Sequence, residues 1–143
     1  MKTQNKGFTL VELLVVVAII GIIAAIAVPQ YGDYVTRSKL SEAHSTLSEM
    51  RVKLEQYFQD NRTYDGACAA GTVAPTPTGK YFTYACSNLA ATTYTVTATG
   101  IASQGTGSFV FTVNQANARA TTGAPTGWTT STSCWIVNKG GGC

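Results

Sequence analysis

The chain has 143 residues, 45% of them hydrophobic, and carries ten Lys and Arg against seven Asp and Glu, for a formal net charge of +3. This length accommodates one anchor segment and one small domain, and so small a charge does not by itself enforce capture of a polyanion. No Asp or Glu follows Asp65, so the C-terminal half offers neither a carboxylate acid/base pair nor an oxygen cage for calcium. The single histidine, His44, is interpreted as a surface residue of a helix. With no nucleophile motif, phosphate-binding loop or zinc spacing, we expect no enzymatic activity, no cofactor and no metal.

An apolar run from Phe8 to Val28 follows the basic residues Lys2 and Lys6. As a helix it would be about 31 Å long, enough to cross the hydrocarbon core of a bilayer. It reads either as a secretory signal peptide cleaved near Ala25-Ile26-Ala27, or as a single-span anchor with its basic end in the cytoplasm. The run is longer than a signal-peptide core, and Glu12 interrupts it. A carboxylate within such a helix costs about 2.5 to 3.5 kcal/mol, which predicts a functional partner for it.

The apolar pattern changes after Pro29 but keeps a helical period, which predicts an amphipathic helix continuing to about Asn61. Gly21 and Pro29 are poor helix formers, so the stretch between them is expected to be the weakest part of the helix. Both a bend and local unwinding are open there. The apolar stripe is formed by Leu40, Ala43, Leu47, Met50, Leu54 and Tyr57.

Beyond Gly66 apolar residues alternate with threonines, and this period of two indicates strands. Gly-rich and Ser/Thr-rich turns between them favour an antiparallel sheet with one face on the helix. The fold class is therefore α+β, a long N-terminal helix packed on a four-stranded antiparallel sheet. Four strands are expected. The first begins with Tyr81–Ala85, and the others are Thr93–Ala98, Phe109–Val113 and Cys134–Val137.

The chain from Gly66 onward holds all the cysteines, and its only charged residues are three cations. Cysteines outside the inner membrane predict two disulfides in an oxidising compartment, and three pairings are open. The cysteines are Cys68, Cys86, Cys134 and Cys143. The candidate contacts to DNA or to a surface are Lys80, Arg119 and Lys139.

The segment from Lys6 to Pro29 resembles the class III leader and N-terminal helix of type IVa prepilins, in which a Gly and a Phe precede a Glu four residues further on, ahead of a long apolar helix. The resemblance implies that prepilin peptidase cuts between Gly7 and Phe8 and that the new amino group of Phe8 is methylated. It also implies that Glu12 neutralises the Phe8 amine of a neighbouring subunit during assembly. Opposite charges attract strongly in a low-dielectric environment, while either charge alone is penalised there.

The resemblance is specific from Lys6 to about Tyr64 and implies the organisation of the chain. Residues 1–7 are a leader, 8–28 a membrane and assembly helix, 29–61 its amphipathic half, and 62–143 an αβ-loop, a sheet and a disulfide-bounded C-terminal region that form a head with 29–61. It also favours unwinding between Gly21 and Pro29 in the filament. Trp128 and Trp135 resemble the tryptophans of minor pilins of the PilE type. Trp128 is open as a contact or a core residue, whereas Trp135 is expected to fill the core. The favoured disulfides are Cys68 with Cys86 and Cys134 with Cys143.

The function implied first is a structural subunit of a type IV pilus. The precursor would sit in the inner membrane of a Gram-negative bacterium and polymerise with other pilin subunits into an extracellular fimbrium for adhesion, twitching motility or DNA uptake. Prepilin peptidase is an implied partner, as are, indirectly, the assembly platform and its ATPases. One alternative is a DNA-binding minor pilin for natural transformation, with Lys80, Arg119 and Lys139 on phosphates. A type II secretion pseudopilin is another, which the lack of C-terminal acids disfavours.

Overall fold

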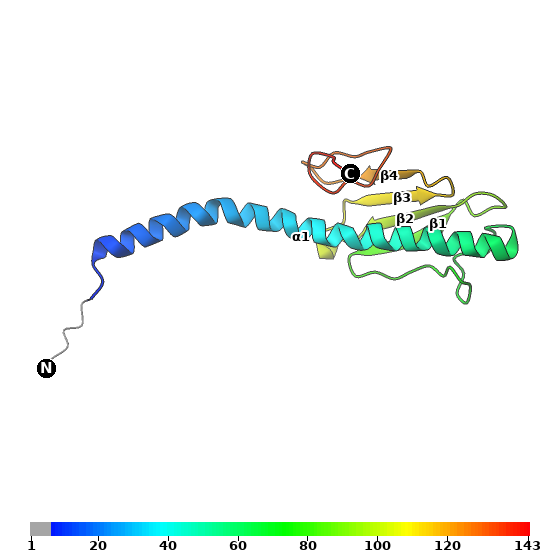
Figure 1. Cartoon of the computed structure of the whole chain (residues 1–143), viewed down its shortest axis with the longest axis horizontal. Helices are drawn as coiled ribbons and strands as arrows, with labels where there is room; N and C mark the ends of the chain where they lie inside the picture. Colours follow the sequence, from blue (N-terminus) through cyan, green and yellow to red (C-terminus); the bar gives the residue numbers. More distant parts are fainter. Residues whose placement is uncertain (1–6) are drawn as a thin grey trace. The chain divides into compact units, whose positions relative to one another are not determined.

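The computed structural model describes residues 7–143, and within them one long helix precedes a four-stranded sheet (Figure 1). The chain divides into two compact units, the first ending at Val35 and the second running from Thr36 to Cys143. The elements are α1 (Leu10–Asn61), β1 (Phe82–Ser87), β2 (Thr95–Gly100), the short 3-10 helix η1 (Ala102–Gln104), β3 (Val110–Asn114) and β4 (Arg119–Gly123).

The first unit holds the start of α1, which a reciprocal pair of hydrogen bonds fixes at Leu10. The Glu12 backbone N–H donates to Thr9 Oγ1 at 3.2 Å, and the Thr9 backbone N–H donates to the Glu12 carboxylate at 3.0 Å. This is a capping box, in which residues at the N-cap and three positions later satisfy each other's free N–H groups. Phe8 therefore lies outside the helix, which was expected to include it.

The apolar half of α1 is long enough to span a membrane. Within residues 7–143, α1 is the helix that meets this criterion of length and composition, and its most apolar window has no buried residues. The helix continues through Gly21 and Pro29 without a break. Unwinding of this stretch inside a filament stays a prediction.

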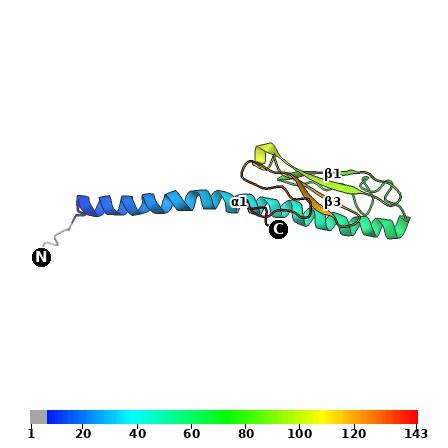
Figure 2. The ribbon, with the colours of Figure 1, turned by 90° about the horizontal axis from the view of Figure 1, so that it is seen from above.

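The second unit packs residues 36–61 of α1 along one face of the sheet (Figure 2). The sheet order is β1-β2-β3-β4, and all neighbouring strands are antiparallel. Alternate strand residues face α1 and meet the predicted apolar stripe, because side chains point to opposite faces in turn along a strand. The core formed in this way includes Leu40, Ala43, Leu47, Met50, Leu54, Phe82, Val96, Ala98, Phe111 and Val113.

The fourth strand is not where the sequence predicts it. β4 is Arg119–Gly123, while Cys134–Val137 is irregular. The backbone N–H of Ile136 donates to the Thr121 hydroxyl at 3.0 Å and that of Val137 donates to the Gly142 carbonyl, so neither joins a ladder. Trp135 and Ile136 are buried as a plug while Val137 is exposed, so the apolar run reflects packing of an irregular segment and not a strand.

Glu42 joins α1 to the start of β1. Its carboxylate accepts hydrogen bonds from the backbone N–H groups of Lys80, Tyr81 and Phe82 at 2.9 to 3.3 Å. Gly79 makes this approach possible, because a Cβ there would lie 2.6 Å from the Glu42 carboxylate. A single acid on the helix therefore holds the edge strand of the sheet.

Candidate nucleic-acid interface

Two lysines meet beside Tyr81 at the corner where β1 begins. The Lys39 Nζ lies 5.5 Å and the Lys80 Nζ 5.2 Å from the centroid of the Tyr81 ring. Lys39 also donates to the Gln104 carbonyl at 2.7 Å, while Lys80 is exposed. The negative face of an aromatic ring attracts ammonium groups and so helps to hold two of them close together. We refer to Lys39, Lys80 and Tyr81 as the lysine corner.

A second cation rests on an aromatic ring contributed by the C-terminal region. The Arg119 guanidinium carbon lies 4.5 Å from the centroid of the Trp135 ring. Trp135 is only 6% exposed, and its Nε1 donates to the Thr112 carbonyl at 2.8 Å. His44 of α1 stacks on the same indole at 5.5 Å between centroids. These three residues, Arg119, Trp135 and His44, form the arginine stack.

His44 is not the surface residue that its helical position suggested. Its ring meets Phe111 edge-on at 4.8 Å, and its Nε2 is buried without a hydrogen-bond partner. Burial, and then the nearby charge of Arg119, lower the pKa of His44 from 6.5 to about 4, because both disfavour the protonated ring. At neutral pH the imidazole is therefore uncharged.

The turn between β3 and β4 is rigidly built and presents Arg119. Asn114 Oδ1 accepts from the backbone N–H groups of Ala116 and Ala118 at 3.1 and 3.0 Å. Asn117 adopts a left-handed conformation with φ of 55°, which asparagine tolerates better than most residues. Its Oδ1 accepts from Arg119 Nε at 3.3 Å. Residues 115–118 are all exposed, and we refer to them as the hairpin tip.

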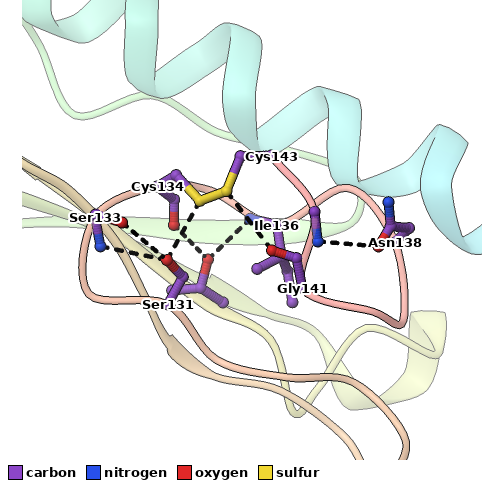
Figure 3. Close-up of a disulfide and its surroundings, with 9 residues drawn as sticks. Ser131, Ser133, Cys134, Ile136, Asn138, Gly141 and Cys143 are labelled. Atoms are coloured by element: carbon purple, nitrogen blue, oxygen red, sulfur yellow. Dashed lines mark hydrogen bonds between the residues drawn. A yellow bond between two sulfur atoms is a disulfide. The ribbon is translucent and has the colours of Figure 1, made fainter.

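The third predicted cation, Lys139, lies in a loop closed by a disulfide between Cys134 and Cys143 (Figure 3). The Thr121 hydroxyl donates to the Cys134 carbonyl at 2.9 Å and so ties the loop to β4. At its other end the Gly142 N–H donates to Asn138 Oδ1 at 3.0 Å, and Lys139 is exposed between them. We refer to residues 134–143 as the C-terminal loop.

The other disulfide links the connection before the sheet to the edge strand β1. It joins Cys68 to Cys86, 18 residues apart. Both disulfides have the pairing that the family resemblance implies. Trp128, which the sequence left open as a contact or a core residue, is partly buried and meets Phe109 edge-on at 5.0 Å.

The sheet separates two of the predicted cations. Lys80 precedes β1 at one edge, whereas Arg119 begins β4 at the other edge. The register places them at opposite ends as well, since Phe82 pairs with Gly100 at the end of β2 and Arg119 pairs with Val113 near the end of β3. The lysine corner and the arginine stack are thus two sites rather than one patch.

The predicted processing site lies just before α1. Gly7 and Phe8 are outside any helix or strand, and the Phe8 side chain is 86% exposed. The rest of the predicted leader, with Lys2 and Lys6, falls outside the described residues. An exposed, non-helical Gly7-Phe8 bond is compatible with access by a peptidase.

Comparison with known families places the chain. A family model described as "Type IV minor pilin ComP, DNA uptake sequence receptor" matches residues 29–109. The chain belongs to this family. A second model, "Prokaryotic N-terminal methylation motif", matches residues 2–28 of the pilin. As a pilin it is a structural, non-enzymatic protein, as the sequence predicts.

Individual relatives of the pilin are fimbrial proteins. Fimbrial protein EcpC of Eikenella corrodens is 42% identical over 99 residues, which cover 69% of this pilin and 65% of that relative. Type IV major fimbrial protein FimA of Dichelobacter nodosus (strain VCS1703A) is 46% identical over 82 residues, covering 57% and 51%. The pilin thus matches between half and two thirds of the length of these relatives.

A solved structure shares the fold of the pilin. The crystal structure of the Neisseria meningitidis non-core minor pilin PilV matches with a TM-score of 0.54 at 22% identity, covering 64% of this pilin and 91% of that chain. The likeness shows the pilin fold, with the long helix packed on a four-stranded antiparallel sheet.

Proposed function

We propose that this pilin is a DNA-binding minor subunit of a type IV pilus that captures DNA for uptake. The family match supports this reading, which the sequence alone ranked behind a general structural subunit serving adhesion or motility. The proposal assigns phosphate contacts to the lysine corner and to Lys139, and a further contact to Arg119.

The observation that carries the proposal is that Lys80 and Arg119 lie away from carboxylates. Residues 66–143 contain no Asp or Glu. Lys53 pairs with Glu49 at 2.7 Å, whereas neither Lys80 nor Arg119 has a carboxylate of residues 7–143 within ion-pair distance. Cations without a carboxylate partner are available to replace the counterions of DNA phosphates, the step that drives nonspecific DNA binding.

The same proposal covers the route of the subunit into the filament. Prepilin peptidase would cut between Gly7 and Phe8, and Phe8 would be N-methylated. The exposed apolar half of α1 would leave the inner membrane and associate with other pilin subunits, driven by the assembly platform and its ATPases. Glu12 would meet the Phe8 amine of a neighbour, and the head would then be displayed outside a Gram-negative cell.

DNA binding is tested with the full chain in a nonionic detergent and a fluorescent DNA duplex, by anisotropy over a range of salt concentrations. Three to four phosphate contacts predict a slope of log K against log salt of about −3. Replacing Lys80 or Lys139 by Gln should make the slope shallower by about 1 each, because each change removes one phosphate contact.

Lys53→Gln is the matched control. It removes the same charge from a lysine that already has a carboxylate partner, so the slope should stay as in the wild type. Absence of salt-sensitive binding by the wild-type chain would rule out the proposed function. If Lys53→Gln and Lys80→Gln changed the salt slope equally, the binding would depend on net charge alone and the assigned contact of Lys80 would be wrong.

A further inference from the structure

The arginine stack restrains Arg119 in a way that a simple phosphate contact does not require. A face of the guanidinium lies over Trp135, and its Nε donates to Asn117. These contacts leave the two terminal amino groups of the partly exposed side chain available. A guanidinium whose plane is fixed presents two parallel N–H groups, the geometry that a bidentate acceptor fits.

The support beneath Arg119 is itself fixed. Trp135 is anchored through its Nε1 to Thr112 of β3, and the C-terminal loop that carries it is tied to β4 through Thr121. His44 beside the indole is uncharged at neutral pH. The positive charge at this site is therefore that of the oriented Arg119 guanidinium alone. The site is therefore built for orientation more than for charge.

The surroundings of Arg119 fit a groove of duplex DNA. β3 and β4 are neighbouring antiparallel strands joined by a short turn (Figure 1). Because β3 is also paired with β2, only the hairpin tip projects beyond the sheet, and the major groove admits an element as wide as a two-stranded turn. The tip carries only small or amide side chains. Two of its four residues are alanines, and no acid is present to repel phosphates.

From these observations we propose that the hairpin tip enters the major groove of DNA and that Arg119 reads a guanine there, through its two terminal N–H groups on O6 and N7. The inference rests on the proposed DNA-binding function. Asn117 and Trp135 act as positioning residues for Arg119. The lysine corner, at the opposite edge of the sheet, supplies phosphate contacts without reading bases.

The test is selection from a pool of randomised DNA duplexes with the full chain in nonionic detergent, followed by affinity measurements on the enriched duplex and its single-base variants. The wild-type chain should enrich at least one fixed G·C pair. Arg119→Lys keeps the charge but loses the planar fork, so discrimination at that pair should fall by about 5- to 150-fold. The slope of log K against log salt should change by less than about 1.

Two further variants separate orientation from charge. Asn117→Gly suits the left-handed turn and removes only the amide that holds Arg119 Nε, so it should lower discrimination at the same pair while leaving the salt slope unchanged. Lys80→Gln should do the opposite, with a shallower slope and the same enriched sequence. Thermal unfolding of each variant near the wild-type temperature confirms that the head is folded.

The outcomes separate this inference from the function on which it rests. If the wild type binds DNA without sequence preference, or if Arg119→Lys enriches the same sequence with the same discrimination, the guanine-reading role is overturned while DNA binding stands. If the wild type binds no duplex at all, both the function and the inference fail.

Discussion

At the scale of single residues, the arginine stack links a buried histidine to a surface cation. His44 lies within the packing of the head yet keeps an unpaired nitrogen, and Arg119 stands close enough to disfavour its protonation. A buried group that must gain a charge makes the folded state sensitive to acid. The pKa of His44 falls from 6.5 in the unfolded chain to about 4 in the folded one, so its cost is absent above pH 6.5 and develops as the pH falls toward 4.

We therefore expect His44→Phe to remove part of the acid sensitivity of the head. Below pH 6.5 the unfolded wild-type chain takes up a proton that the folded chain does not, which lowers the free energy of unfolding by about 2 kcal/mol at pH 4 after allowance for partial exposure of the ring. Urea unfolding of both proteins between pH 4 and 8 measures this. Curves that stay parallel over the whole range would contradict the prediction.

At the scale of elements, two disulfides restrain segments that no ladder holds. One ties the connection before β1 to that strand, and the other closes the C-terminal loop. In the chain-entropy description a cross-link stabilises more when it closes a longer loop. The sequence separations are 18 and 9 residues, so the first disulfide should contribute more to stability.

Replacing Cys134 and Cys143 together by Ser should lower the free energy of unfolding by about 2 to 3 kcal/mol. Replacing Cys68 and Cys86 should lower it slightly more. Urea unfolding of the wild type and the two double variants under non-reducing conditions measures which loss of stability is larger. A reversed order would mean that native contacts, and not loop length, determine the contribution of each disulfide. The C-terminal variant should also become sensitive to proteolysis at Lys139, because the loop is no longer closed.

The sequence predicts the elements that depend on local pattern and misses those that depend on tertiary partners. The stripe from Leu40 to Leu54 is buried as expected, because its helical period suffices to define a face. β4 was missed because Ala120, Thr121 and Thr122 lack apolar alternation, and its pairing with β3 decides its conformation. The segment Cys134–Val137 is the opposite case, because its apolar residues predict a strand but Trp135 and Ile136 are buried in an irregular segment.

The candidate site was predictable only in part for the same reason. Lys80 and Arg119 stood out because the sequence around them lacks acids. Lys39 was missed, since only the packing of α1 on the sheet brings it to Tyr81. Asn117 was missed as well. An Asn two positions before the Arg, at the end of a strand pattern, was the available signal for it.

At the scale of the whole molecule, α1 serves both units and carries Glu12 at its start. Glu12 has a local role in the capping box in addition to the predicted intermolecular one. A variant that removes the Glu12 side chain therefore changes both the start of the helix and the assembly of the filament. Glutamine separates them, because it can cap a helix in the same position without a charge.

We expect Glu12→Ala and Glu12→Gln both to leave leader removal intact and to abolish normal filament assembly, since each leaves the Phe8 amine of a neighbour unpaired. Filament yield after shearing, with the intact mass of the subunit, measures both steps. Normal assembly of Glu12→Gln would assign the role of Glu12 to capping. Gly7→Ser is the processing control, and it should retain a precursor heavier by about 0.8 kDa.

The contact between Glu42 and the start of β1 has a mechanical meaning. The three hydrogen bonds to one carboxylate add to the close-packed core in resisting shear along the helix axis. Part of a pull transmitted through α1 would therefore reach the sheet at its β1 edge, next to Lys80. With Lys80 in its proposed role on DNA, traction on the fibre and the hold on DNA would act on the same short stretch of backbone.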